Sequence, residues 1–227
     1  MTSAHPAPGS TPGASEPLAF GPVSPGSSAA EPADSTPDAA AAAAETTAQP
    51  TPRTAARPED QPTGPTSAAS PLTTAAAEVL RLATAAGLTL AVAESLTGGR
   101  LAAALTWPAG ASRAFRGSVT AYATELKAAV LGVDPDLLAR VGAVDAEVAR
   151  QMAAGVRALC GSDLALATTG VAGPTPQDGR PVGTVYIALA DHQGAEAALF
   201  RFSGTRSSIQ DATVAAALNL MVNHLNS

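Results

Sequence analysis

Hydrophobic residues follow a helical period in some segments of residues 73–227 and form short apolar runs in others. Helical spacing predicts six helices, over residues 73–86, 100–106, 124–131, 134–140, 145–160 and 207–225. Apolar or alternating runs predict five strands, over residues 88–93, 117–123, 164–169, 182–190 and 196–202. The turn at residues 191–194 makes the last two strands an antiparallel pair. The order of elements therefore predicts an α/β fold, a three-layer sandwich in which helices flank a mixed β-sheet.

Residues 1–72 follow neither period. They hold 14 of the 19 prolines, an alanine run at residues 39–44 and a single aromatic residue, Phe20. Such a segment lacks the large apolar side chains that would offset its ordering entropy, which predicts a disordered tail rich in Pro, Ala, Ser and Thr. A solubilising spacer is favoured over a specific docking segment. Residues 73–227 then form one domain, which is long enough to bury a core without disulfides.

Composition excludes several kinds of site and location. The one cysteine, Cys160, cannot form an intrachain disulfide or a cysteine-based metal site, and His5, His192 and His224 are far apart in the sequence, so we expect no metal. A net charge of −6 argues against a mainly electrostatic nucleic-acid binder. No apolar run approaches the ~18 residues that span a membrane. The first residues lack a secretion signal, so we expect a cytoplasmic protein that does not bind membranes.

The first candidate for chemistry is the glycine-rich turn at residues 94–99, ESLTGG, between a predicted buried strand and a helix. Such a turn presents free backbone N–H groups and the positive end of a helix dipole, which suits a phosphate or an oxyanion. Ser95 is the candidate nucleophile, and Thr97, Gly98 and Gly99 are candidate donors. The turn lacks the Lys-Ser/Thr pair of the nucleotide phosphate loop and does not match the dinucleotide fingerprint. A purely structural turn explains the glycines equally well.

A serine nucleophile needs a base, and the best candidate is Lys127, the only lysine among 13 basic residues. A surface position would have followed the chain's preference for arginine, but arginine cannot act as a base. A lysine becomes a base only if burial or a nearby cation lowers its pKa. Tyr122 precedes it by five residues across a strand-to-helix junction, so both side chains can reach one pocket. The alternative is an ordinary solvated lysine.

Two further segments add polar groups. Thr169, Gly170 and Gly173 lie in the loop that follows the predicted strand 164–169. Arg206 precedes the last helix, where an arginine at a helix start suits a phosphate. A solvated side chain is the simpler interpretation of Arg206 taken alone.

Six motifs together resemble one known family, the CinA C-terminal domain family. They are AESLTGG at 93–99, AYATELK at 121–127, GAVDAEVA at 142–149, TTGVAGP at 168–174, PVGTVY at 181–186 and FSGTR at 202–206. The resemblance covers essentially all of residues 73–227. The longer family architecture adds an N-terminal molybdopterin-binding-like domain, which residues 1–72 do not resemble, so we expect a stand-alone form.

The resemblance implies a nicotinamide-nucleotide amidase, which hydrolyses nicotinamide mononucleotide to nicotinate mononucleotide and ammonia without a cofactor. The family's serine corresponds to Ser95, its tyrosine and lysine to Tyr122 and Lys127, and its arginine to Arg206. Thr169 stands where the family usually has serine. Neutral Lys127 would accept the Ser95 proton, with Tyr122 relaying or orienting it. The backbone around Thr97–Gly99 would bind the oxyanion, and Arg206 the phosphate.

Two other functions are compatible with part of this pattern. A short-chain dehydrogenase also uses Ser, Tyr and Lys, but its tyrosine and lysine are four residues apart on a helix and it has a glycine fingerprint; neither is present. The stronger alternative is a non-enzymatic accessory protein of competence or DNA damage that binds a protein partner. Whichever of these functions the protein has, we expect a homo-oligomer, most simply a dimer.

Overall fold

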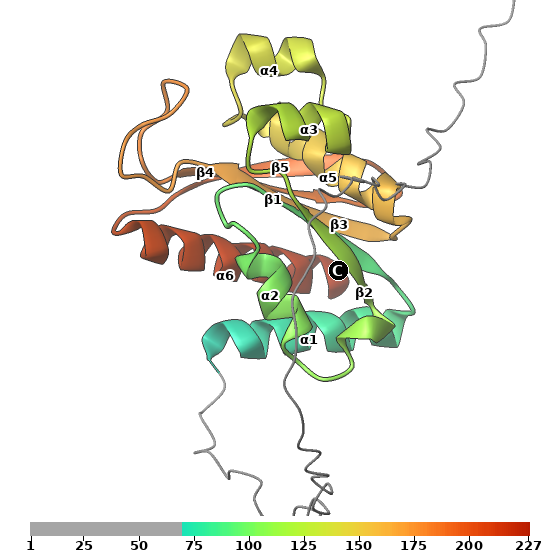
Figure 1. The fold of residues 1–227 in the computed structure, drawn as a ribbon. Helices are drawn as coiled ribbons and strands as arrows, with labels where there is room; N and C mark the ends of the chain where they lie inside the picture. Colours follow the sequence, from blue (N-terminus) through green and yellow to red (C-terminus); the bar gives the residue numbers. More distant parts are fainter. Residues whose placement is uncertain (1–69) are drawn as a thin grey trace, which may run out of the picture. The chain divides into compact units, whose positions relative to one another are not determined.

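A mixed sheet of five strands lies at the centre of the part of the chain that this computed structural model describes, residues 70–227 (Figure 1). The strand order is β2-β1-β3-β4-β5. Three strands are parallel: β2 (Phe115–Thr120), β1 (Leu90–Glu94) and β3 (Leu164–Gly170). Next to them, β4 (Thr184–Ala190) is antiparallel to β3, and β5 (Ala195–Arg201) is antiparallel to β4. The predicted mixed sheet is confirmed.

Helices cover both faces of this sheet (Figure 1). One face is covered by α1 (Pro71–Ala86), α2 (Arg100–Thr106) and α6 (Arg206–Leu225). The other is covered by α5 (Ala146–Cys160), against which α3 (Thr124–Leu131) packs, and α4 (Pro135–Val141) packs in turn on α3. A short 3₁₀ turn, Ala111–Arg113, was not predicted. The predicted three-layer α/β sandwich is confirmed, with a separate hydrophobic core on each side of the sheet.

Burial explains the two kinds of strand in the sequence. Every residue of β1 is buried, and so are the first six of β3, because helices cover both faces of the central strands. The edge strand β2 instead alternates between partly buried and exposed residues. No helix among residues 70–227 has the length and apolar character needed to cross a membrane.

Several predicted boundaries move by one to three residues, and the shifts of the first helix and the second strand matter most. The first helix begins at Pro71, because the Ser70 side chain accepts a hydrogen bond from the Thr73 N–H and proline suits the first helical turn. Ser70 to Leu72 therefore belong to the folded part rather than to the predicted tail. The rest of that prediction, residues 1–69, lies outside the described residues.

The second strand also begins earlier than predicted, because Phe115 pairs with Leu90. It ends at Thr120 instead of residue 123. Consequently Tyr122 lies in the short connection between β2 and α3, and not on a strand. This connection brings its side chain to the edge of the sheet where β1 also ends.

The packing of α5 against α3 is unusually close at Gly155. A methyl group at this position would overlap the carbonyl oxygen of Leu131, the last residue of α3. Glycine therefore permits the two helices to approach each other. This contact fixes α3, the helix that carries Lys127.

Candidate active site

A cavity of about 210 Å³ lies where the chain leaves the carboxyl ends of β1 and β3. This is the edge at which open α/β sheets bind their ligands. Seven of the predicted site residues line the cavity: Ser95, Tyr122, Lys127, Thr169, Gly170, Gly173 and Arg206. The structure thus brings together residues that are up to 111 positions apart in the sequence.

Ser95 is the first residue after β1. Its N–H donates to the carbonyl oxygen of Thr168 (3.0 Å), which continues the pairing of β1 with β3 by one residue. The side chain is partly buried and lines the cavity. The serine is therefore held by a regular sheet while remaining open to a ligand.

Lys127 is almost wholly buried, with 1% of its surface exposed. It occupies the inner face of α3 together with Leu131 one turn later, so it is not a surface charge. Its Nζ donates to the carbonyl oxygen of Ala121 (2.8 Å), and the carbonyl oxygen of Tyr122 lies at 3.5 Å. Within residues 70–227 it forms no ion pair.

Burial is the main influence on the protonation of this lysine. Desolvation lowers the pKa of Lys127 below its ordinary value of 10.5, because a cation is costly in a site with little water. The negative charges of Asp178 and Glu125 act in the opposite direction but do not cancel the effect. The neutral amine, which is the form that can accept a proton, is therefore favoured more than in a solvated lysine. Ser95 and Lys127 line one cavity, although no hydrogen bond joins their side chains in the described part of the chain.

Tyr122 and Arg206 form a bridge at this cavity. The Arg206 guanidinium donates to the hydroxyl oxygen of Tyr122 (2.6 Å) and to the carbonyl oxygen of Gly173 (2.7 Å). The predicted relay from the Tyr122 hydroxyl to Lys127 is not formed, because this hydroxyl contacts Arg206 instead. Only the backbone oxygen of Tyr122 approaches the lysine.

The turn after Ser95 differs from its prediction. Thr97, Gly98 and Gly99 do not line the cavity. The Gly99 N–H donates to the carboxylate of Glu94 (3.0 Å), and the hydroxyls of Thr97 and Thr168 lie 2.8 Å apart in a buried contact. The first N–H groups of α2 are thus occupied by a side chain of the protein and are not free for a phosphate.

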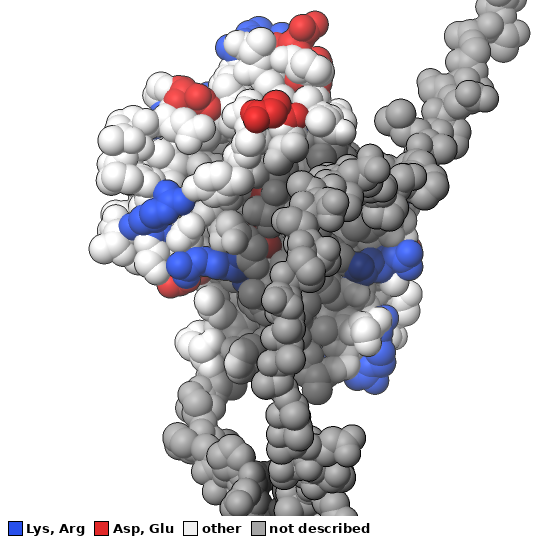
Figure 2. All heavy atoms as spheres, in the orientation of Figure 1, with Lys and Arg blue, Asp and Glu red and all other residues white. Residues whose placement is uncertain are grey.

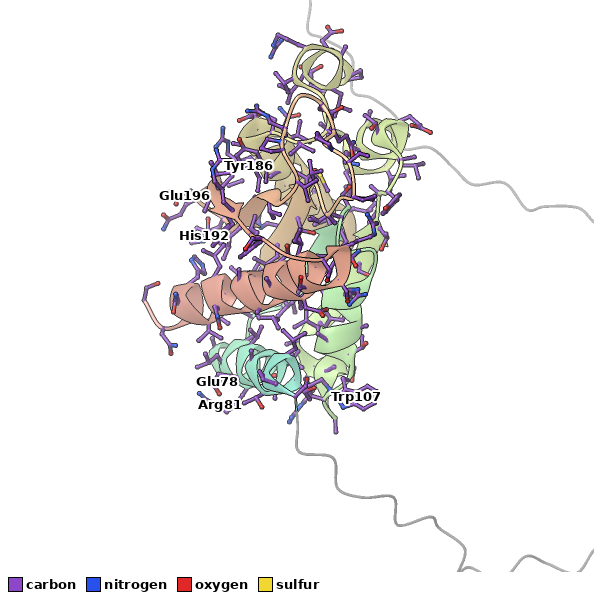
Figure 3. All side chains as sticks on the ribbon, turned by 90° about the vertical axis from the view of Figure 1, so that its left-hand side faces the viewer. Glu78, Arg81, Trp107, Tyr186, His192 and Glu196 are labelled. Carbon is purple, nitrogen blue, oxygen red and sulfur yellow. The ribbon has the colours of Figure 1, made fainter. Side chains whose placement is uncertain are left out.

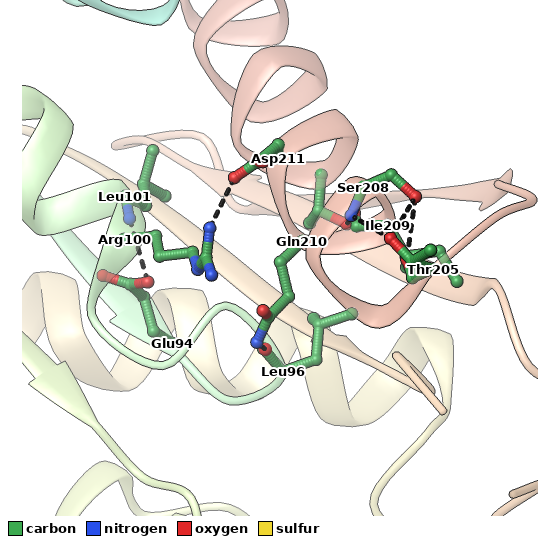
Figure 4. A network of polar contacts seen from close by, with 10 residues as sticks. Glu94, Leu96, Arg100, Leu101, Thr205, Ser208, Ile209, Gln210 and Asp211 are labelled. Atoms are coloured by element: carbon green, nitrogen blue, oxygen red, sulfur yellow. Dashed lines mark hydrogen bonds and ion pairs between the residues drawn. The ribbon is translucent and has the colours of Figure 1, made fainter. Parts of the chain in front are cut away.

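Glu94, the last residue of β1 and the neighbour of Ser95, was not singled out as a functional residue from the sequence. Its carboxylate is completely buried and also accepts from the N–H groups of Leu101 (3.0 Å) and Ala102 (2.8 Å), as Figure 4 shows for Leu101. A signal existed in the sequence, because a carboxylate at the end of a wholly apolar strand must find donors.

The loop after β3 closes another side of the cavity. The Thr169 hydroxyl donates to the carbonyl oxygen of Ala143 (2.6 Å), so it is already committed to a structural bond. A Cβ at Gly170 would come within 2.6 Å of the carbonyl oxygen of Thr184, which explains the glycine at this point. Asp178 accepts from the Ala143 N–H (2.7 Å) and anchors the loop further along. Gln177, which the sequence reasoning did not single out, also lines the cavity.

The histidines lie elsewhere. His192 is exposed on the turn between β4 and β5 (Figure 3), and His224 is near the end of α6, 3.7 Å from Asp191. Neither lines the cavity, so neither is placed to act as its base. Asp191, Glu196 and His224 border a second hollow of about 680 Å³ between β5 and α6, which none of the predicted site residues lines. Within residues 70–227, no three His, Cys, Asp or Glu side chains are grouped closely enough for a metal ion.

The fold and the cavity define an α/β domain with a polar cavity at the carboxyl edge of its sheet. Residues 72–225 match the model of the family described as the CinA C-terminal domain. The chain belongs to this family.

Similar proteins agree with that assignment. A CinA-like protein of Frankia casuarinae is 53% identical over 129 residues, covering 57% of this chain and 30% of the relative. A CinA-like protein of Geobacter sulfurreducens is 47% identical over 147 residues, covering 64% and 36%. The chain therefore spans about a third of the length of these relatives.

Solved structures of the same superfamily have the same fold. A competence-damaged protein (CinA) superfamily protein of Klebsiella pneumoniae superimposes with a TM-score of 0.67 at 33% identity, covering 68% of this chain and 98% of that chain. A competence/damage inducible protein of Agrobacterium tumefaciens gives 0.66 at 34% identity, covering 69% and 96%.

Proposed function

We propose that this domain hydrolyses the carboxamide of nicotinamide mononucleotide to nicotinate mononucleotide and ammonia. The observation that carries the proposal is the buried Lys127 in the cavity that Ser95 also lines. A buried lysine without an ion-pair partner is costly for stability, and a functional site is where such a cost is usually found. The motif resemblance described above supplies the substrate.

The chemistry follows a serine nucleophile with a lysine base. Neutral Lys127 takes the Ser95 proton as the serine oxygen attacks the amide carbon, and a tetrahedral oxyanion forms. When the carbon–nitrogen bond breaks, the lysine returns this proton to the leaving nitrogen, and ammonia departs. Water then attacks the nicotinoyl ester, with Lys127 again as base, which releases nicotinate mononucleotide and restores the serine.

The substrate's phosphate suits Arg206 at the start of α6. This helix has 20 residues, so the positive end of its dipole adds to the arginine charge. Figure 2 shows basic side chains beside the start of α6, below the acidic side chains of α3 and α4. The Arg206 guanidinium now donates to the neutral oxygens of Gly173 and Tyr122, and a phosphate is a stronger acceptor than either.

The test is to incubate the full chain with nicotinamide mononucleotide and to measure both ammonia and nicotinate mononucleotide. We expect equal amounts of the two products from the wild type and none above background from Ser95→Ala. Ser118→Ala, an exposed serine on β2, is the matched control and should keep full activity. Normal ammonia release by Ser95→Ala would contradict the acyl-enzyme.

The second candidate is a non-enzymatic role in competence or DNA damage. The observation that favours it is that the solved relatives are named for competence and damage and not for a reaction. This function predicts no product from the wild type, so the same assay distinguishes the two.

A further inference from the structure

Two buried polar side chains, Glu94 at the end of β1 and Gln210 on α6, form hydrogen bonds that hold the turn at residues 95–99. We propose that Glu94 and Gln210 are positioning residues, which fix this turn so that the N–H groups of Leu96 and Thr97 bind the oxyanion formed at Ser95. The inference rests on the proposed function, because it concerns the acyl-transfer step of the same site. Of the donors expected from the sequence at Thr97–Gly99, it keeps Thr97 and adds Leu96, because the N–H groups of Gly98 and Gly99 already have acceptors.

Glu94 holds the end of the turn. Its two carboxylate oxygens accept three N–H groups, from Gly99, Leu101 and Ala102, at 2.8–3.0 Å. No arginine or lysine pairs with this carboxylate among residues 70–227. The neighbouring Arg100 pairs with Asp211 instead (Figure 4). Bonds to a charged acceptor are stronger than those to a neutral one, so they tie α2 firmly to the strand that ends in Ser95.

Gln210 holds the middle of the turn from α6. It is a buried amide, 8% exposed, and its Nε2 donates to the carbonyl oxygen of Leu96 at 2.7 Å (Figure 4). The peptide bond is planar and trans, so the carbonyl of one residue and the N–H of the next point in opposite directions. The Thr97 N–H therefore points away from Gln210.

The same geometry applies to the preceding peptide. The carbonyl oxygen of Ser95 accepts from the Gly98 N–H (3.1 Å), so the Leu96 N–H points away from that bond. The N–H groups of Ser95, Gly98 and Gly99 all have acceptors. Those of Leu96 and Thr97 have none within residues 70–227, and Leu96 lines the cavity. Two free consecutive donors directly after a nucleophile suit an oxyanion.

The two positioning residues make different contacts, so each can be removed separately. Glu94→Gln keeps the size of the side chain but replaces one acceptor oxygen with an amide nitrogen, which cannot accept the N–H groups. Gln210→Met keeps the length and removes the donor to Leu96. Asp163→Asn is the matched control, because Asp163 accepts the Thr89 N–H (2.8 Å) and hydroxyl (2.6 Å) just ahead of β1, at the end of that strand remote from the cavity.

The experiment measures kcat and KM of the full chain for nicotinamide mononucleotide, together with the thermal midpoint of each variant. We expect kcat to fall about 10- to 100-fold in Glu94→Gln and Gln210→Met, as for other groups that orient a reactive site. KM should stay within about twofold, because the lost interaction acts only in the transition state. Asp163→Asn should lower the thermal midpoint without this loss of kcat.

A second readout does not depend on the nucleotide. A fluorophosphonate phosphonylates an activated serine: the serine oxygen bonds to phosphorus, fluoride leaves, and the proton goes to the base. Labelling of Ser95, followed by peptide mass, should slow in both variants by a similar factor. If the wild type is labelled but does not hydrolyse the nucleotide, the proposed function fails and the positioning role is judged on labelling alone.

Three results would overturn the inference. The first is wild-type kcat and labelling in either variant when it is folded. The second is a loss of kcat in Asp163→Asn as large as that in Glu94→Gln and Gln210→Met, when all three variants have the same thermal midpoint. This would show that the loss of kcat comes from lowered stability alone. The third is a wild-type protein that neither turns over the nucleotide nor reacts with the fluorophosphonate at Ser95.

Discussion

Lys127 is an ionisable side chain buried where an apolar residue would be more stable. It is among the largest fully buried side chains of residues 70–227, and within that range its Nζ donates only to backbone carbonyl oxygens. Burial lowers its pKa below 10.5. Desolvation makes this residue a usable base and also lowers the stability of the folded protein. The effect on activity and the effect on the free energy of unfolding can be measured separately.

The first prediction concerns activity and pH. Because the base must be neutral, kcat should rise with pH while Lys127 loses its proton, and should level off at a pH below 10.5, since burial lowers the pKa of this lysine. A pH profile of ammonia release at saturating nucleotide measures this. A rate that falls over the same range, or one that does not change with pH, would contradict the role of the lysine.

The second prediction concerns stability and pH. Between the lowered pKa of folded Lys127 and the unfolded value of 10.5, the unfolded chain binds the extra proton, so the free energy of unfolding should increase with pH. For one proton the slope is at most about 1.4 kcal/mol per pH unit. Urea unfolding from neutral to alkaline pH measures it, with Lys127→Met for comparison. The slope should be smaller in the variant by this amount; an equal slope in both proteins would assign it to other groups.

At the scale of elements, the apolar period in the sequence predicted nearly all helices and strands. Helix ends were accurate where a glycine in the left-handed region stops the helix, as at Gly87, Gly132 and Gly161. The start of β2 was missed because it depends on the pairing of Phe115 with Leu90, which local spacing does not reveal.

The site was predictable to the extent that each residue had a local signal. Ser95 lies at a strand-to-turn junction, and Lys127 is unusual in composition, so both could be selected from the sequence. The bonds from Arg206 to Tyr122 and from Gln210 to Leu96 join residues 84 and 114 positions apart. No local pattern in the sequence encodes these two bonds, which is why the sequence did not predict them.

The third prediction belongs to the contact between α3 and α5. Gly155→Ala would normally favour a helix by about 1 kcal/mol. Here the added methyl group overlaps the Leu131 carbonyl oxygen, so we expect a loss of about 1–3 kcal/mol in the free energy of unfolding. Urea unfolding checks the sign. Ala154→Ser, at an exposed neighbouring position of α5, is the control and should change stability by no more than about 0.5 kcal/mol. A stabilised Gly155→Ala would show that the helices can move apart.

At the scale of the whole chain, every residue that lines the cavity lies between Ser95 and Arg206, and the family match covers residues 72–225. Both hydrophobic cores are also built within the described residues. This arrangement places the complete candidate site in one folded unit.

The fourth prediction follows from that arrangement. A protein comprising residues 70–227 alone should hydrolyse nicotinamide mononucleotide with kcat and KM close to those of the full chain. Steady-state kinetics of the two proteins at equal concentration make the comparison. A large loss of kcat in a folded 70–227 protein would show that the preceding residues contribute to catalysis.

The most direct test of the whole account is the initial rate of ammonia release from nicotinamide mononucleotide by Lys127→Met. Methionine suits the buried position better than arginine, because it is neutral and similar in length. Loss of a general base predicts a decrease of about 10²- to 10⁴-fold in kcat. A folded Lys127→Met protein that releases ammonia at the wild-type rate would contradict the proposed mechanism.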